Sequence, residues 1–166
     1  MNVIMKYLII ACIIVSLILI SLLIPSQNIV TENADLSLTI SMDKTSFNAE
    51  ESIILYVTLE NIGNDTVRTN ELTMKYDSLF LNVTDTIGNE MELIGVRIRN
   101  PGDSIVLRPS QEITMEYDLI EYVYFNDDAI SYNLNMEYKS YGYSSDDKET
   151  WRGSVDSNTL TFTISS

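Results

Sequence analysis

The sequence predicts an all-β domain of roughly seven to nine strands, built as two antiparallel sheets packed face to face and preceded by one apolar helix. Apolar and polar residues alternate with period two in six separate segments between residues 36 and 164. No segment of this body has the 3.6-residue period of an amphipathic helix, and turn-forming residues separate the segments. The helix is predicted from a distinct apolar run near the N-terminus.

That apolar run covers residues 7–24, in which Ser16 and Ser21 are the two polar residues. A helix of this length spans roughly 27 Å at about 1.5 Å per residue, close to the bilayer core of about 30 Å. Lys6 is the one charged side chain before the run, and Glu32 is the first after it. The positive-inside rule therefore places the N-terminus in the cytoplasm and the rest of the chain outside.

Two fates of this segment remain open. An uncleaved anchor divides the chain into a cytoplasmic n-region (1–6), a transmembrane helix (7–24), a linker (25–35) and an extracellular body (36–166). A cleaved signal peptide would instead release a secreted protein, although its apolar stretch is normally shorter. Cys12 and the three residues before it resemble a bacterial lipoprotein processing site, but twelve more residues of the run follow it.

The first three predicted strands each place apolar side chains on one face. The predicted inward residues are Leu36, Leu38, Ile40 and Met42, then Ile53, Leu55, Val57 and Leu59, then Leu79, Leu81 and Val83. Polar residues such as Thr39 and Asn82 occupy the alternate positions. Each strand therefore has one face toward the core and one toward solvent, as strands of antiparallel sheets commonly do.

Three further strands follow the same rule. Their inward residues are Ile113, Met115, Tyr117 and Leu119, then Ile130, Tyr132, Leu134, Met136 and Tyr138, then Leu160, Phe162 and Ile164. Turns are expected at 61–65, 87–89, 100–103, 108–110 and the longer stretch 141–148. Trp151 is expected in the core, and a closed barrel is the alternative architecture.

Four short motifs in order give the body a resemblance to known domains: 59–63, 85–88, 107–109, and 151–158 leading into Leu160 and Phe162. This order resembles immunoglobulin-like β-sandwiches of archaeal and bacterial surface proteins. It is also similar to the bacterial intracellular proteinase inhibitor family, except that Ser110 stands where that pattern usually has Gly. The resemblance covers roughly residues 36–165 and implies an immunoglobulin-like sandwich. No inhibitory loop can be matched residue by residue.

Composition excludes several kinds of chemistry. The 166 residues contain no His and one Cys, which rules out a Ser-His-Asp triad, a Cys-His pair and an internal disulfide framework. With 24 acidic and 10 basic side chains the formal net charge is -14, which disfavours binding to nucleic acid or anionic lipid. We expect no enzyme activity, no cofactor and no metal site, because the acidic pairs at 127–128 and 146–147 lack the spacing of a calcium loop.

Two kinds of candidate site remain. Asn64 and Asn82 stand in N-x-Thr glycosylation sequences. Seven of the ten tyrosines lie between residues 117 and 143, and tyrosine is enriched in binding patches. The predicted recognition loop therefore carries Tyr141, Tyr143, Asp146 and Asp147, the alternative being that these tyrosines pack against the domain.

The sequence thus predicts a non-catalytic binding or structural module at the cell surface, held by a single N-terminal anchor, with a protein partner or surface ligand. Exposed strand edges would allow a partner to add a strand. A β-sandwich proteinase inhibitor and an accessory subunit of a membrane complex are the alternatives.

Overall fold

The computed structural model describes residues 35–49, 51–95, 98–125 and 131–165, and this part of the chain is all-β. The predicted n-region, transmembrane helix and most of the linker lie outside the described residues. In the described ranges no helix has the length and apolar character needed to cross a membrane. Their elements are twelve strands and one 3-10 helix: β1 (Leu36–Met42), β2 (Ser46–Asn48), β3 (Ile54–Asn61), β4 (Val67–Asn70), β5 (Leu79–Asp85), β6 (Glu92–Leu93), β7 (Ser104–Leu107), β8 (Glu112–Asp118), η1 (Leu119–Glu121), β9 (Val123–Tyr124), β10 (Ser131–Tyr143), β11 (Glu149–Asp156) and β12 (Leu160–Ser165).

The first large sheet has the strand order β1-β3-β8, and both pairings are antiparallel. β3 lies in the centre, with Leu38 opposite Leu59 and Leu59 opposite Ile113. Its inward residues Leu55, Val57 and Leu59 are fully buried, as their alternation predicted.

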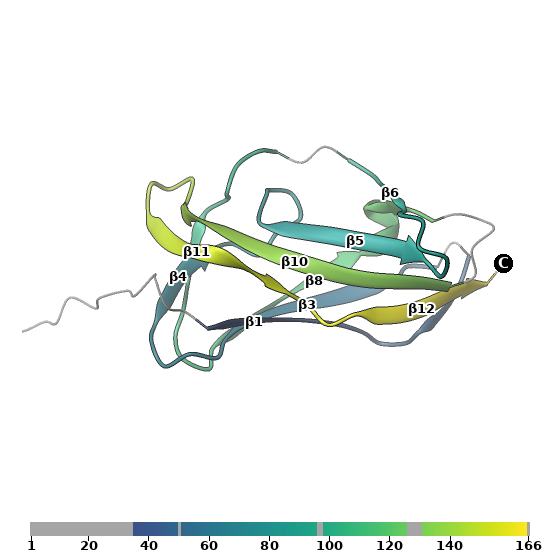
Figure 1. Ribbon diagram of the computed structural model, residues 1–166, viewed down its shortest axis with the longest axis horizontal. Helices are drawn as coiled ribbons and strands as arrows, with labels where there is room; N and C mark the ends of the chain where they lie inside the picture. The colour runs from purple at the N-terminus through teal and green to yellow at the C-terminus, as the bar shows by residue number, and fades with distance from the viewer. Residues whose placement is uncertain (1–34, 50, 96–97, 126–130, 166) are drawn as a thin grey trace, which may run out of the picture.

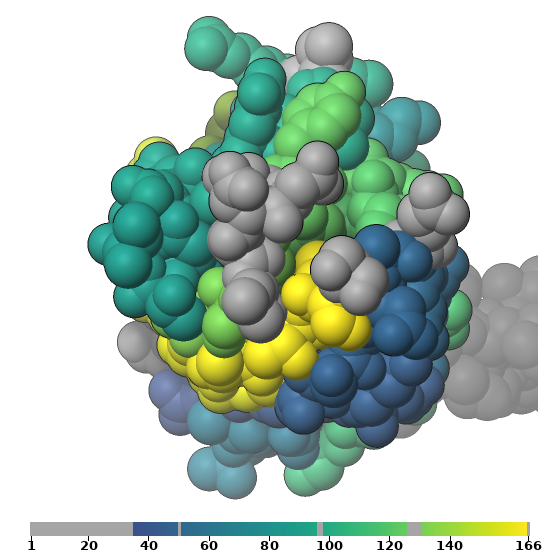
Figure 2. All heavy atoms as spheres, turned by 90° about the vertical axis from the view of Figure 1, so that its right-hand side faces the viewer, coloured from purple at the N-terminus to yellow at the C-terminus, as the bar shows by residue number. Residues whose placement is uncertain are grey.

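The second large sheet is organised around β10, the longest strand. β5 pairs with one edge of β10, while β11 and β12 pair with successive halves of the other edge. β2 then pairs with β12 in parallel, an arrangement that the antiparallel prediction did not include. Figure 2 shows β2 in blue beside β12 in yellow at this end of the molecule.

The inward side chains of both large sheets form one hydrophobic cluster. The two sheets lie on opposite sides of it, with β1, β3 and β8 behind β5, β10 and β11 in Figure 1. Tyr117, Tyr132, Tyr138 and Trp151 are all buried, which confirms their predicted core positions. The ring of Phe162 contacts those of Phe47, Phe125 and Tyr132 at centroid distances of 6.1, 5.8 and 5.5 Å.

Three details differ from the sequence prediction. The described residues contain twelve strands, more than the predicted seven to nine. Five of them are short strands (β2, β4, β6, β7 and β9), and the number of the remaining strands, seven, falls within the prediction. The stretch 141–148 is not all turn, since β10 runs to Tyr143 and β11 starts at Glu149. Met115 has the inward parity but is 38% exposed, because no strand of the described residues lies beyond β8 to cover it.

Candidate functional site

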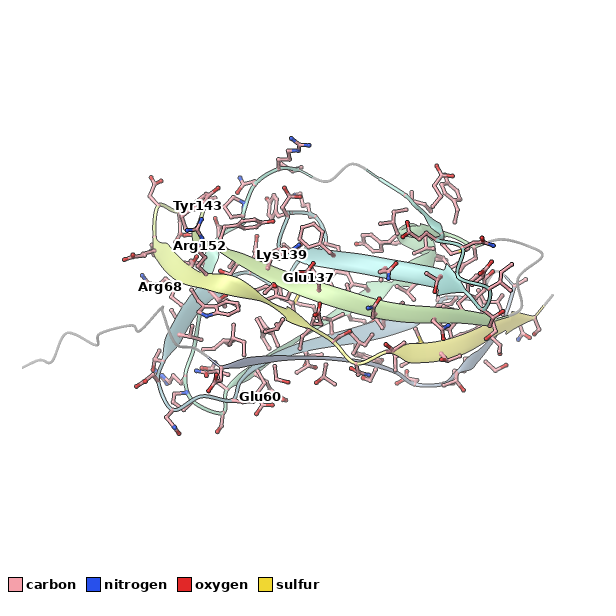
Figure 3. All side chains as sticks on the ribbon, in the orientation of Figure 1. Glu60, Arg68, Glu137, Lys139, Tyr143 and Arg152 are labelled. Atoms are coloured by element: carbon pink, nitrogen blue, oxygen red, sulfur yellow. The ribbon has the colours of Figure 1, made fainter. Side chains whose placement is uncertain are left out.

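The predicted recognition loop is the hairpin between β10 and β11, at the end of the molecule far from β6 (Figure 1). The rings of Tyr141 and Tyr143 lie 6.5 Å apart. Tyr143 is 59% exposed, whereas Tyr141 is half-buried. Gly142 between them has a φ of +85°, and the strand register shifts there, so the bulge requires a residue without a side chain. Figure 3 shows Tyr143 and Arg152 together at this end.

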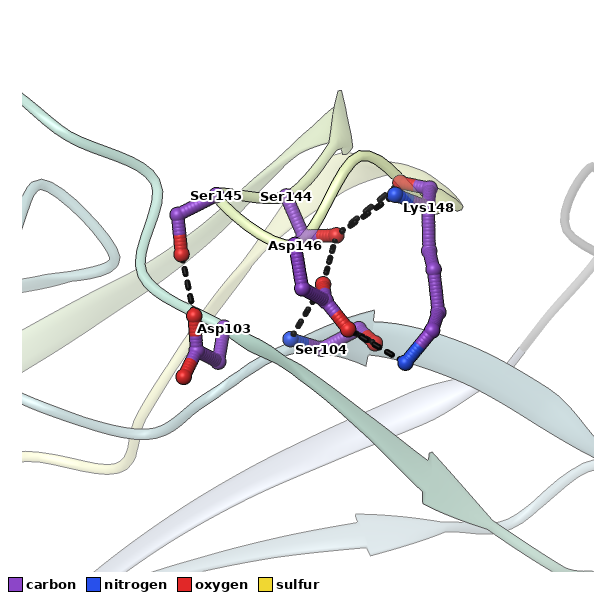
Figure 4. Close-up of polar contacts among 6 residues, drawn as sticks. All are labelled: Asp103, Ser104, Ser144, Ser145, Asp146 and Lys148. Atoms are coloured by element: carbon purple, nitrogen blue, oxygen red, sulfur yellow. Dashed lines mark hydrogen bonds and ion pairs between the residues drawn. The ribbon is translucent and has the colours of Figure 1, made fainter.

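Asp146 is engaged in holding this hairpin against β7. Its carboxylate accepts hydrogen bonds from the backbone N–H of Ser104 at 3.2 Å and from its hydroxyl at 3.1 Å, and it pairs with Lys148 (Figure 4). The Lys148 ammonium and the Ser144 hydroxyl, with Ser104, hold the pKa of Asp146 below its ordinary value. The carboxylate therefore stays charged and serves contacts within the chain.

Ser145 connects the same hairpin to the loop that precedes β7. Its backbone N–H donates to the carbonyl of Gly102 at 2.8 Å, and its hydroxyl donates to Asp103. Asp147 is exposed with a φ of +56°, a conformation that Asp tolerates in turns. The structure thus places Asp146 and Asp147 in the turn and leaves Tyr143 as the exposed aromatic group of the four predicted residues.

Asn70 of β4 holds the base of the hairpin from inside. Its side-chain oxygen accepts from the Ser140 hydroxyl at 2.8 Å and from the Tyr141 N–H at 3.2 Å. Its amide group donates to the carbonyl of Tyr143 at 2.9 Å, and Asn70 itself is fully buried. The hairpin is therefore fixed to the core by a satisfied amide.

Two buried tyrosines use their hydroxyl groups structurally. Tyr138 donates to the carbonyl of Asn70, and Tyr117 donates to that of Leu72 at 3.0 Å. Burial raises the pKa of Tyr117 to about 12 and raises the pKa of Tyr138 as well. Both phenols therefore stay protonated at neutral pH, where they act as hydrogen-bond donors in the core.

The two glycosylation candidates occupy different environments. Asn64 is exposed in the loop between β3 and β4. Asn82 is exposed on the outer face of β5, but its amide group already donates to the side chain of Asn135 at 3.0 Å. Asn64 is the more accessible acceptor of the two.

A pocket that the sequence did not predict has a volume of about 330 Å³ and lies among β5, β6 and η1. Its lining is mostly apolar, with Lys75 and Glu121 as its charged groups. The apolar side chains are Met74, Leu81, Leu93, Ile94 and the ring of Tyr122. The Ile94 N–H donates to the Tyr122 carbonyl at 2.7 Å, which joins two of its walls. Leu93 and Ile94 lie between Glu92 and Gly95 in a stretch without alternation, so only tertiary structure reveals their role.

Within the described residues, no group of three or more acidic or cysteine side chains converges to hold a metal ion. The ionisable groups at the pocket are the carboxylate of Glu121 and the amine of Lys75, which could interact with a polar end of a ligand. The arrangement is suited to enclosing an apolar group, since pockets that bind small ligands have volumes from about 300 Å³ upward and mostly apolar walls.

No protein-family model and no curated protein matches this chain. Among solved structures, the putative ApaA protein from Bordetella pertussis is similar over 81% of this chain and 98% of its own, with 12% identity and a TM-score of 0.47. A β-glucosidase from Listeria innocua in complex with isofagomine is similar over 80% of this chain, with 13% identity and a TM-score of 0.44. This chain spans 16% of the length of that β-glucosidase. AvmM, which catalyses macrocyclization in alchivemycin A biosynthesis, has a TM-score of 0.39 and 11% identity, over 81% of this chain and 91% of its own. Likenesses at these scores assign neither a family nor an activity to the chain.

Proposed function

We propose that this chain is a membrane-anchored, extracytoplasmic binding module of the immunoglobulin-like β-sandwich type, with no chemistry of its own. The apolar run at 7–24 and the acidic body after it support the anchor and the orientation. The strand orders β1-β3-β8 and β5-β10-β12 support the sandwich, since they follow the A-B-E and C-F-G pairings of immunoglobulin domains. β11 and β12 together then occupy the position of strand G.

The pocket among β5, β6 and η1 is the observation that carries the binding function. It is a mostly apolar site present in the structure without a ligand, with walls from β5, β6, η1 and the loops beside them. The role of the module is then to hold an apolar side chain or a small apolar ligand outside the membrane.

The orientation is tested by labelling single cysteines with a membrane-impermeant maleimide. We expect Asn64→Cys, which is exposed in the loop after β3, to react on cells whose cytoplasmic membrane is intact. Asn2→Cys should react only after the cells are permeabilised, and the unaltered chain, whose one Cys lies in the apolar run, serves as the control. Reaction of Asn64→Cys only after permeabilisation would contradict the proposed location.

The pocket is tested with p-cresol as a small apolar probe, added to the full chain in nanodiscs of phosphatidylcholine. Met74 lines the pocket and Met115 lies outside its lining, so their side-chain methyl groups, labelled with ¹³C, report binding and nonspecific effects separately. We expect the Met74 signal to shift saturably with a dissociation constant of about 1 mM, a value normal for so small a ligand. Leu93→Glu, at a position that is 40% exposed, should abolish the shift. Equal shifts at both methionines would contradict a specific pocket.

A further inference from the structure

The outer edge of β8 is an open strand edge. The Leu119 N–H donates to the Ile53 carbonyl at 2.9 Å, and the Asn61 N–H donates to the Gln111 carbonyl at 3.0 Å. Hydrogen-bonded pairs alternate along an antiparallel ladder, so the odd-numbered residues of β8 bond to β3. The backbone groups of Glu112, Thr114 and Glu116 therefore point away from the sheet, where no strand of the described residues pairs with them.

Two other strand edges of the large sheets are partly covered. On β1, the side-chain amide of Asn158 accepts from the Ile40 N–H at 2.9 Å and donates to the Ile40 carbonyl at 3.0 Å, in the manner of a neighbouring strand. On β5, the Met91 N–H donates to the Val83 carbonyl at 2.8 Å and closes the second half of the edge. β8 has seven residues and no comparable cover among the described residues, so it is a place for strand addition.

The side chains of β8 indicate what an added strand would carry. On the outer face, Glu112 and Glu116 flank Thr114 at alternate positions, all three exposed. Glu112 also lies directly opposite Glu60 of β3, and like charges in facing positions destabilise a sheet. Figure 3 shows Glu60 on the side of the molecule away from Glu137 and Lys139, and no cation of the described residues forms an ion pair with Glu60 or Glu112.

On the inner face, the edge presents apolar surface. Ile113 is half-buried and Met115 is 38% exposed, although both have the parity of core residues. An added strand places its alternate side chains over these two residues and its remaining side chains beside the glutamates. The complementary strand therefore alternates basic and apolar residues.

We propose that β8 binds an extended segment of a partner protein in which basic and apolar side chains alternate, by adding that segment as a fourth strand to β1-β3-β8. Backbone hydrogen bonds provide the affinity and the carboxylates select the partner. A second copy of this chain fits less well, because antiparallel pairing of two β8 strands about Thr114 would place Glu112 opposite Glu116. This surface deepens the proposed binding function but involves none of the pocket residues.

The test measures binding of a fluorescent peptide of alternating lysine and valine to the full chain in phosphatidylcholine nanodiscs. We expect saturable binding, with slowed hydrogen exchange at the backbone N–H groups of Glu112, Thr114 and Glu116. The double variant Glu112→Lys and Glu116→Lys should weaken binding at least tenfold. A control with Asp65→Lys and Glu90→Lys makes the same change of net charge at exposed positions outside β8 and should bind as the unaltered chain does.

A second peptide, methylated on alternate backbone nitrogens, separates strand addition from general attraction to an acidic protein. It keeps the charges but loses the hydrogen-bond donors, so we expect it not to bind. Equal binding of both peptides, equal binding by both double variants, or no binding at all would overturn the proposal. Slow exchange at Thr114 before any peptide is added would also overturn it, because the edge would already be paired. None of these outcomes bears on labelling at Asn64 or on the Met74 signal, so failure here is distinguishable from failure of the proposed function.

Discussion

Replacing Asn70 with Leu is expected to lower the free energy of unfolding by about 3 kcal/mol or more. The change keeps the volume of the side chain but removes its contacts with the Ser140 hydroxyl, the Tyr141 N–H and the Tyr143 carbonyl. A buried polar group that loses its partner costs about 1–3 kcal/mol, and Asn70 is fully buried, so water cannot replace the amide.

Trp151 provides the measurement. It is the one tryptophan of the chain, it is 8% exposed, and its carbonyl accepts a hydrogen bond from the Ser140 hydroxyl beside Asn70. Its fluorescence during urea unfolding therefore follows the part of the fold that the variant disturbs. Asn64→Leu is the matched control, because Asn64 is exposed, and it should change stability by less than about 0.5 kcal/mol. A similar small effect of Asn70→Leu would show that the amide does not hold the hairpin.

Phe162→Ala is expected to destabilise the domain by about 3–5 kcal/mol, the usual cost of removing a buried aromatic ring. Phe162 is 1% exposed, and its ring contacts those of Phe47, Phe125 and Tyr132, which come from β2, the segment after β9, and β10. Within that total, each edge-to-face or stacked contact that does not re-form accounts for about 0.5–1.5 kcal/mol.

The conservative variant Phe162→Leu separates ring packing from simple burial. It keeps an apolar side chain and should cost less than half of the Ala substitution, again measured by urea unfolding. Tyr143→Ala removes a ring that is 59% exposed and is expected to stay within about 0.5 kcal/mol of the unaltered chain. No loss for the Leu variant at Phe162 would contradict the role of the aromatic contacts, and a loss equal to that of the Ala variant would contradict a contribution from simple burial.

The alternation of residues predicted the buried face of β1, β3, β5, β10 and β12 because each large sheet has one face against the core and one toward water. Leu55, Val57 and Leu59 are fully buried for this reason. The alternation did not predict β11. Met115 follows the same alternation and is still partly exposed, because burial also depends on a neighbouring strand, which sequence parity does not report. The parallel pairing of β2 with β12 joins residues more than 100 positions apart, and no local pattern encodes it.

The functional surfaces were less accessible to sequence analysis. Tyr143 was predicted as part of a recognition loop from tyrosine enrichment; the structure shows that it is exposed, and its part in recognition stays a prediction. Asp146 belonged to the same prediction, but its partner Ser104 is 42 residues away, so its role in the turn could not be foreseen. Asn70 lies between Thr69 and Glu71 in a polar stretch typical of a turn, and its burial becomes evident only once β4 packs beside β10.

The single amide of Asn158 has a consequence for how this molecule behaves at high concentration. It occupies both backbone hydrogen-bonding groups of Ile40 in the middle of β1, whose outward face carries the uncharged side chains of Ser37, Thr39 and Ser41. A strand added at the outer edge of β1 would have to displace this amide from Ile40 first. Asn158 therefore disfavours self-association through β1, whereas the outer edge of β8 has no such obstacle among the described residues.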